Sequence, residues 1–248
     1  MRAFAVRERG GAEERRYYRF RGGRWYGGIA TGDVVGCNLR CGFCWGWRRA
    51  SHIMVPARFY RPEEVFRKLT SIVERRGYRL VRLSGGEPTL SRKHLLSLLD
   101  LFEDTGLWFI LETNGILIGA DEGYAEELAQ HRRLVVRVSL KGTNEEEFHK
   151  LTLARPEFFR YQLKALENLV DAGLEPGEQV YPAVMLSFNT DEEIRWLMER
   201  LAEIHPALPE EIDPEYVILY PHVVKSLKAH GVKPRRAFTP DNVPVEMI

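Results

Sequence analysis

Features that would mark a membrane, secreted, fibrous or disordered protein are missing from this sequence. Its 248 residues include no apolar run near the roughly 18 residues that a bilayer-spanning helix needs. The N-terminus is charged and lacks the apolar segment of a signal peptide. No repeat or Gly/Ser/Pro-rich linker divides the chain, and 44% hydrophobic with 29% charged residues is typical of a folded domain. We therefore expect a cytoplasmic protein with no membrane partner.

Net charge is nearly absent as well. The 36 Lys and Arg residues are balanced by 35 Asp and Glu residues, which leaves a formal net charge of +1. No overall field therefore draws the chain onto nucleic acid or lipid. Basic and aromatic residues do interleave near the N-terminus, at Arg15, Arg16, Tyr17, Tyr18, Arg19, Arg21, Arg24, Trp25 and Tyr26. Such a segment can hold an RNA strand or form a solvated β extension, and we favour the β extension.

Cysteine is scarce, and its placement is informative. The chain has three cysteines, and all of them lie within eight residues, at Cys37, Cys41 and Cys44. An odd number crowded into one segment argues against a disulfide framework. We interpret the three thiols as metal ligands.

Hydrophobic periodicity and helix-end signals predict alternating strands and helices. Strands are expected at residues 29–36, 78–83, 107–112, 134–140, 179–188 and 216–220. Helices are expected at residues 62–76, 91–105 with Ser91 as the N-cap, 121–130, 144–172 with a break at Pro156, and 191–204. This alternation predicts a single α/β domain with a parallel sheet and right-handed crossovers, either open or an incomplete barrel.

The core is flanked by two segments of different composition. We expect residues 1–28 to be an N-terminal extension or hairpin, residues 29–220 to be the core, and residues 221–248 to be a C-terminal tail. The tail carries a basic stretch and either closes the open side of the barrel or contacts a partner.

Polar residues follow successive strands at the point where each strand ends. They are Gly85, Gly86 and Glu87 after the second strand, Asn114 after the third, Ser139 and Lys141 at the fourth, and Asn189 at the fifth. Because the carboxyl ends of parallel strands meet at one rim, we expect these residues to share a site with the cysteine loop.

The spacing C-x3-C-x2-C leaves two kinds of metal site to compare. A structural zinc site needs four ligands, usually in two pairs; His52 is a possible fourth ligand, but the second pair is missing. A [4Fe–4S] cluster held by three thiolates keeps one iron free of protein ligands, and an open position of this kind is where a substrate or cofactor binds. We favour the cluster.

On these residues the sequence resembles the radical S-adenosylmethionine (radical SAM) superfamily. Its hallmark, C-x3-C-x-φ-C with an aromatic φ, is matched by Cys37, Cys41, Phe43 and Cys44, and its Gly-Gly-Glu-Pro segment by residues 85–88. The resemblance covers about residues 29–220 and implies a partial (β/α)6 TIM-type barrel. It also implies a [4Fe–4S] cluster, SAM, and a flavodoxin- or ferredoxin-like electron donor. Such enzymes cleave SAM reductively to a 5′-deoxyadenosyl radical, which abstracts hydrogen from the substrate.

The resemblance implies roles for the residues nearest the cysteines. Phe43 would pack near the adenine, with a loop aromatic that fills the core as the structural alternative. Gly85 and Gly86 would leave room for the ligand, and Glu87 would accept a hydrogen bond from the SAM amino group. The alternative for these three is a plain strand–helix turn with a capping carboxylate.

The resemblance also implies roles for residues at the ends of the later strands. Asn114 resembles a ribose or carboxylate contact, with an Asn-Gly turn as the alternative. Lys141, beside Ser139, would pair with the SAM carboxylate unless it is simply exposed, and Asn189 would contact the ribose. Residues that would cover the cluster or meet the substrate, unless they form a solvated surface, are Trp45, Trp47, Arg48, Arg49 and His52.

The substrate hypotheses differ in class. Residues 136–152 resemble the pyruvate formate-lyase activating enzyme group, whose helix reads E-x-x-x-K-L-T-G; here Leu153 replaces the glycine. The first hypothesis is therefore a minimal, monomeric activase of a glycyl-radical protein, with no auxiliary cluster. The second is modification of RNA or of a small metabolite. A non-enzymatic metal carrier is a third, which the Gly-Gly-Glu-Pro segment disfavours.

Overall fold

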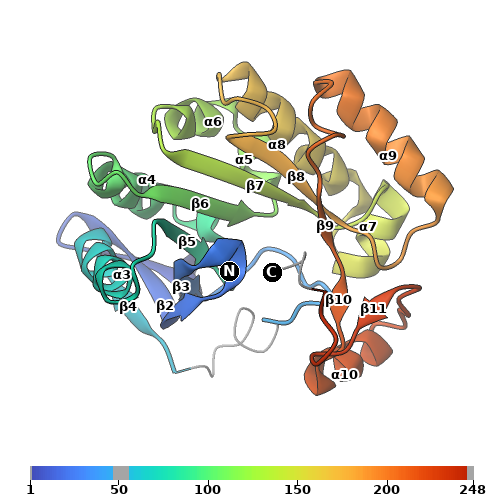
Figure 1. Ribbon diagram of the computed structural model, residues 1–248, viewed down its shortest axis with the longest axis horizontal. Helices are drawn as coiled ribbons and strands as arrows, with labels where there is room; N and C mark the ends of the chain where they lie inside the picture. Colours follow the sequence, from blue (N-terminus) through green and yellow to red (C-terminus); the bar gives the residue numbers. More distant parts are fainter. Residues whose placement is uncertain (1, 47–55, 245–248) are drawn as a thin grey trace.

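A nine-stranded sheet forms the centre of the protein, seen in a computed structural model that describes residues 2–46 and 56–244 (Figure 1). Its strands are β1 (Val6–Arg9), β2 (Ala12–Gly23), β3 (Ile29–Val34), β4 (Arg58–Tyr60), β5 (Leu80–Ser84), β6 (Trp108–Thr113), β7 (Leu134–Leu140), β8 (Val180–Met185) and β9 (Asp213–Glu215). Strands β3, β5, β6, β7, β8 and β9 are parallel neighbours in that order. The predicted α/β class with a partial parallel barrel is confirmed.

Helices cover the outer side of this curved sheet, as Figure 1 shows. They are α3 (Pro62–Arg76), α4 (Arg92–Phe102), α5 (Ile116–Gly119), α6 (Glu122–Ala129), α7 (Glu145–Thr152), α8 (Phe159–Asp171) and α9 (Asp191–Ile204). Short 3-10 turns lie at Trp25–Gly27, Pro88–Leu90 and Pro156–Phe158. The bounds of α3, α9 and β7 match the prediction, and the 144–172 helix breaks between Thr152 and Pro156 as expected.

The bounds of helix α3 were predicted correctly, and its structure shows why local sequence was enough. Pro62 occupies its first turn with two glutamates near the positive end of the helix, and Gly77 ends it in the left-handed conformation. Val65, Leu69 and Ile72 are buried at helical spacing. Sequence-local chemistry therefore defines both ends and the buried face.

The N-terminal residues extend the sheet as a β-hairpin. Strands β1 and β2 pair antiparallel, β2 also pairs antiparallel with β3, and β4 joins β2. Tyr17 is buried with its hydroxyl 2.9 Å from His94 Nε2, and the buried Arg15 donates to the Ala5 and Glu87 carbonyls at 2.8 and 3.1 Å. Much of the basic, aromatic segment is thus part of the folded core.

The sixth parallel strand lies earlier than predicted. Residues 216–220 were expected to form it, but the strand that pairs with β8 is β9, Asp213–Glu215. Within the predicted range, β10 (Val217–Ile218) instead pairs with β11 (Ala237–Phe238) in a separate two-stranded sheet. The prediction was wrong because β9 is short and charged, and its acidic side chains are stabilised by cations on β7 that local sequence does not reveal.

The predicted N-cap role of Ser91 also needs correction. Ser91 occupies the N-cap position of α4, but its side chain makes no cap hydrogen bond. Its hydroxyl donates instead to Glu13 Oε1 at 2.7 Å, and the same oxygen accepts the His94 backbone N–H at 3.3 Å. The carboxylate of β2 therefore caps α4, since a full charge is a stronger acceptor than a hydroxyl.

The two faces of the parallel sheet differ in polarity. Val81, Leu83 and Val136 belong to the hydrophobic core beneath the helices. The alternate residues Arg82 and Arg137 point to the inner, concave face. Parallel sheets buried on both faces are usually apolar throughout, so the polar inner face marks a surface that meets something other than core.

The C-terminal segment packs near the cysteine loop. Helix α10 (Pro221–Ala229) is followed by His230, whose Nε2 lies 3.1 Å from the Arg40 carbonyl oxygen. His222 Nε2 lies 2.8 Å from the Trp45 carbonyl oxygen. Among the described residues, no helix has both the length and the apolar character needed to span a bilayer.

Leu153 gives a test of local strain. It ends α7 with φ 58°, a left-handed conformation unfavourable for a branched side chain, and is 59% exposed. Leu153→Gly should raise the free energy of unfolding by about 0.5–1 kcal/mol, because relief of backbone strain exceeds the entropy that glycine adds to the unfolded chain. Urea unfolding measures this change.

Leu101→Gly is the matched control. Leu101 lies inside α4 and is also partly exposed. Glycine there should lower stability by about 1 kcal/mol. If both variants are destabilised alike, the strain at Leu153 is refuted.

Candidate active site

The cysteine loop follows β3 directly and is held by the end of α7. The Arg40 N–H donates to the Thr152 carbonyl at 3.1 Å, and the Gly42 N–H donates to the Leu151 carbonyl at 2.9 Å. Within the loop, the Cys44 N–H donates to the Cys41 carbonyl at 3.2 Å. These backbone bonds fix the loop that carries all three thiols.

The low exposure of the three cysteines bears on the kind of metal site that they could form; Cys41 is buried, and Cys37 and Cys44 are partly buried. Burial, with Glu87 adding to it, raises the pKa of Cys37 to about 12, and burial likewise raises the pKa of Cys41 and Cys44. A buried thiolate needs a nearby positive charge, and iron ions supply it. The donor set therefore fits an iron–sulfur cluster.

The sulfurs do not converge as a single ion would require. Among residues 2–46 and 56–244, no three Cys, His, Asp or Glu side chains form a group suited to one metal ion. Three thiolates on a [4Fe–4S] cube bind three separate irons, so convergence on one point is not needed. His52, the possible zinc ligand, lies outside the described residues.

The Gly-Gly-Glu-Pro turn packs its backbone against the start of the cysteine loop. The Glu87 N–H donates to the Gly36 carbonyl at 2.7 Å. A Cβ on Gly86 would lie 2.3 Å from that same oxygen, which no side chain tolerates. Glycine is required here because two backbones meet.

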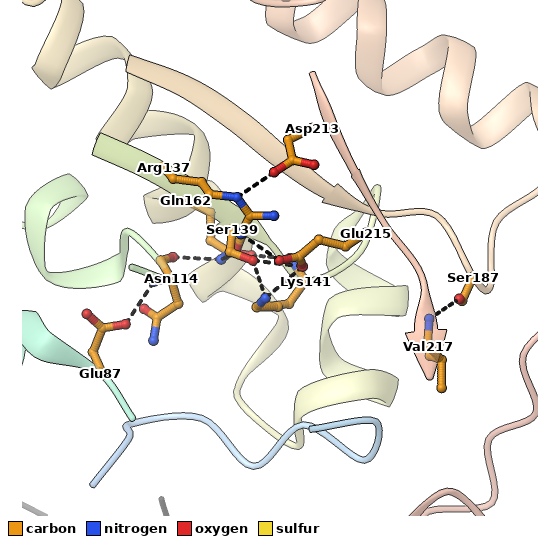
Figure 2. Close-up of polar contacts among 10 residues, drawn as sticks. All are labelled: Glu87, Asn114, Arg137, Ser139, Lys141, Gln162, Ser187, Asp213, Glu215 and Val217. Atoms are coloured by element: carbon orange, nitrogen blue, oxygen red, sulfur yellow. Dashed lines mark hydrogen bonds and ion pairs between the residues drawn. The ribbon is translucent and has the colours of Figure 1, made fainter. Parts of the chain in front are cut away.

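Glu87 connects this turn to the end of β6. One carboxylate oxygen accepts the Thr89 N–H at 3.1 Å and the Thr89 and Thr113 hydroxyls at 2.7 Å each. The other accepts the Asn114 N–H at 2.8 Å (Figure 2). The capping carboxylate foreseen as the structural alternative is present, and the contact with a SAM amino group stays a prediction.

Asn114 links β6 to the cysteine loop. Its Nδ2 donates to Asn38 Oδ1 at 2.7 Å, and its carbonyl accepts Gln162 Nε2 at 2.7 Å. Gln162 is fully buried on α8, donates also to the Ser139 carbonyl at 2.9 Å, and accepts the Lys141 N–H at 3.0 Å. Gln162 therefore braces two adjacent strand ends.

A partly buried charged network lies beside these residues, as Figure 2 shows. Arg137 donates to Asp213 at 2.7 Å and to Glu215 at 2.8 Å, and the Ser139 hydroxyl donates to Glu215 at 2.8 Å. Lys141 Nζ donates to Ser139 Oγ and, at 3.1 Å, to Glu215. The predicted pairing of Lys141 is thus made with a protein carboxylate in this structure, and its contact with SAM stays a prediction.

The charge states in this network follow from its geometry. Burial opposes ionisation of Glu215, but Lys141 and Arg137 outweigh it and hold the pKa of Glu215 at about 2. Burial also opposes the charge on Lys141, and Glu215 reverses the effect and raises the pKa of Lys141. All three groups are therefore ionised at neutral pH.

Phe43 and Asn189 occupy the same end of the barrel. The Phe43 ring lies 5.7 Å from that of Phe188, and Lys141 Nζ is 5.9 Å from its centroid. Asn189 Nδ2 donates to Glu147 at 2.5 Å, whereas its buried Oδ1 has no hydrogen-bond partner among the described residues. An unpaired buried acceptor fits a ligand hydroxyl.

The structure thus brings the cysteine loop, residues 85–87, Asn114, Ser139, Lys141 and Phe43 together. Trp45 is 45% exposed beside α10, and Trp47, Arg48, Arg49 and His52 lie outside the described residues. Four residues of this site were not predicted from the sequence: Gln162, Arg137, Asp213 and Glu215. Two of them could have been found because a polar residue stands where the pattern predicts an apolar one. Gln162 lies on the buried stripe of α8, and Arg137 lies inside an apolar strand.

This combination of barrel, cysteine loop and glycine turn is the arrangement of a radical SAM protein. The family model of the Radical SAM superfamily matches residues 33–201, and the chain belongs to that superfamily. Its members use a [4Fe–4S] cluster and SAM.

Curated relatives resemble the chain over part of their length. "Probable GTP 3′,8-cyclase" of Methanococcus maripaludis is 32% identical over 142 residues, which are 56% of this chain and 44% of that protein. "7-carboxy-7-deazaguanine synthase" of Hyperthermus butylicus is 39% identical over 89 residues, 34% of this chain and 33% of that protein. The chain spans 37–58% of the length of four such cyclases.

Solved structures confirm the fold. Streptococcus suis SuiB bound to S-adenosylmethionine superposes with a TM-score of 0.54 at 19% identity, covering 85% of this chain and 46% of that one. The [FeFe]-hydrogenase maturase HydG gives a TM-score of 0.57 at 14% identity, covering 82% of this chain and 48% of that one. At these identities the likeness concerns the fold alone.

Glu215 provides a test of the buried network. Glu215→Gln should lower the free energy of unfolding at pH 7 by about 3 kcal/mol, because Lys141 and Arg137 keep buried charges that lose their partner. Since the pKa of Glu215 is depressed from 4.5 to about 2, its contribution is complete above pH 4.5 and is lost as pH falls towards 2. The difference between wild type and variant should shrink over that range in chemical denaturation series.

Glu203→Gln is the control, since Glu203 is exposed and pairs with the exposed Arg200 on the same helix. It should change stability by less than about 0.5 kcal/mol. Equal effects of the two variants would contradict a special role for the buried network.

Proposed function

We propose that the chain is a radical SAM enzyme that abstracts hydrogen from a small polar substrate held on the inner face of the barrel. The observation that carries this proposal is the partly buried, charged inner face next to the cysteine loop. Cys37, Cys41 and Cys44 would hold the cluster, which with SAM supplies a 5′-deoxyadenosyl radical when bound.

The chain's own residues have defined tasks in this proposal. The Asn114 side chain, Lys141 and the unpaired Asn189 oxygen offer polar contacts for SAM on the cysteine side of the barrel. Phe43 lies near Lys141 and Phe188 and would give an apolar surface for a planar base. The curved sheet and its helices keep water from the reacting atoms.

The inner face favours a polar substrate. Arg82 pairs with Glu112 at 2.5 Å, Tyr26 donates to the same carboxylate at 3.2 Å, and Arg137 pairs with Asp213. Buried ion pairs add little stability relative to apolar packing, so their abundance here is better explained by a ligand. The names of two relatives also refer to small polar molecules, GTP in one and 7-carboxy-7-deazaguanine in the other.

Activation of a glycyl-radical protein is the second candidate, favoured by the pattern in residues 141–152. The structure offers another reason for that pattern, because the Leu151 and Thr152 carbonyls accept hydrogen bonds from the cysteine loop. These contacts serve the cluster loop whatever the substrate is. The pattern therefore supports radical SAM chemistry but does not favour a protein over other substrates.

RNA modification receives less support from the N-terminal arginines. Arg15 is buried in backbone contacts, and Arg19 and Arg21 both pair with Asp33. Removing their charges would disturb the fold as well as any RNA contact.

Anaerobic reconstitution tests the proposal. Wild type should hold about four iron atoms per chain and release 5′-deoxyadenosine after reduction with SAM, and Cys41→Ser should lose both. Ser71→Ala, on the exposed side of α3, should retain both. A pool of polar metabolites, GTP among them, should raise the yield of 5′-deoxyadenosine, whereas stimulation only by a glycyl-radical protein would favour the activase and a colourless, iron-free protein would refute both.

Radical SAM enzymes need an electron donor, and the C-terminal segment is suited to an acidic flavodoxin- or ferredoxin-like protein. Between residues 221 and 240 the chain has five cations and no carboxylate, and all five are exposed: Lys225, Lys228, Lys233, Arg235 and Arg236. This segment packs against the cysteine loop through His222 and His230. An acidic donor would thus be attracted to the side nearest the cluster.

Charge reversal tests this docking. The double variant Lys225→Glu/Lys228→Glu should slow cluster reduction by flavodoxin about tenfold at low salt, because long-range attraction is lost. Reduction by dithionite should not change. Lys93→Glu, an exposed change on α4, is the control, and equal slowing by both variants would contradict the assignment.

A further inference from the structure

Two arginines of the N-terminal hairpin lie on the inner face of the barrel. Phe20 pairs in register with Gly32, whose Cβ position would touch Phe20 and the core residue Leu83. Lys68 of α3 lies 5.5 Å from the Phe20 ring, so Phe20 faces the helices. Because strand side chains alternate, Arg19 and Arg21 face the opposite, concave side.

These arginines share one carboxylate. Arg19 Nε donates to Asp33 Oδ2 at 2.6 Å, and Arg21 donates to Asp33 through Nε at 2.9 Å and Nη2 at 3.2 Å. The Asp33 side chain is fully buried, whereas those of Arg19 and Arg21 are 35% and 21% exposed. The group of two arginines and one aspartate therefore carries one excess positive charge.

Several N–H donors of the two guanidinium groups are available for a ligand. In the described part of the chain, the terminal nitrogens of Arg19 and Nη1 of Arg21 have no protein acceptor among the hydrogen bonds formed. Guanidinium groups bind phosphate and carboxylate oxygens in pairs of parallel hydrogen bonds. The buried Asp33 fixes both side chains, so little entropy is lost when an anion binds.

The group formed by Arg19, Arg21 and Asp33 is continuous with the other charged residues of the inner face. Thr31, which pairs in register with Arg21, accepts Arg82 Nε at 3.0 Å, and Arg82 pairs with Glu112. Asp33 also lies four residues before Cys37 on the same strand-to-loop segment. A molecule anchored here would extend along the inner face towards the cysteine loop.

We propose that Arg19 and Arg21 form a binding site for an anionic group, phosphate or carboxylate, of the substrate. This inference rests on the proposed function and narrows its substrate to anionic small molecules. It also assigns the hairpin β1–β2 a role in substrate recognition in addition to extending the sheet.

The test uses the full-length chain, purified without oxygen and labelled with 15N-arginine. Methyl phosphate and acetate are titrated separately at constant ionic strength, and the Nε–H resonances of the arginines are followed. Arg19 and Arg21 signals should shift and saturate with at least one of the two anions, and the anion that saturates first identifies the group. Arg19→Gln should weaken that binding at least about tenfold.

Arg75→Gln is the matched control, since Arg75 is exposed on α3 and donates to the Ser71 carbonyl of its own helix. It should leave binding unchanged. Absence of saturable shifts at Arg19 and Arg21 with both anions overturns the inference, even if Arg19→Gln does not fold, because the wild-type titration decides. Anion binding in a protein that makes no 5′-deoxyadenosine would support this site and refute the proposed function, so the two failures are distinguishable.

Discussion

The cysteine loop is held in place by backbone hydrogen bonds from separate parts of the fold, and the active-site arrangement depends on them. Glu87 after β5 donates to Gly36, and the carbonyls that end α7 accept from Arg40 and Gly42. His230 after α10 contacts the Arg40 carbonyl. Three thiols can bind a cluster only if their loop has one conformation, and backbone contacts provide this without using the sulfurs.

Charge on the inner face is the second organising feature. The acids Asp213 and Glu215 of β9 face Arg137 and Lys141, while Glu112 faces Arg82. These pairs nearly cancel, so the barrel interior is polar without being strongly charged. The exception is the pair of arginines at Asp33, where β2 and β3 carry an excess positive charge on the inner face.

Sequence resemblance and structural role diverge in residues 141–153. The pattern there suggested a particular class of substrate, but Leu151 and Thr152 contact the cysteine loop, and Leu153 takes the left-handed conformation that glycine would adopt more easily. The pattern at residues 151 and 152 can therefore be explained by support of the cysteine loop. Its presence identifies the chemistry better than the substrate.

Local sequence was enough to predict the cysteine motif, the α/β alternation and the bounds of α3, α9 and β7, because spacing, caps and periodicity act between neighbours in the chain. It did not reveal that Glu13 caps α4, that Gln162 braces two strand ends, or that β9 completes the sheet. Each of these depends on partners far apart in sequence; Lys141 and Glu215 are 74 residues apart, for example. Such contacts form only in the folded chain. A short charged strand gives no local signal in the sequence, and β9 is stabilised by the opposite charge of Arg137 on β7.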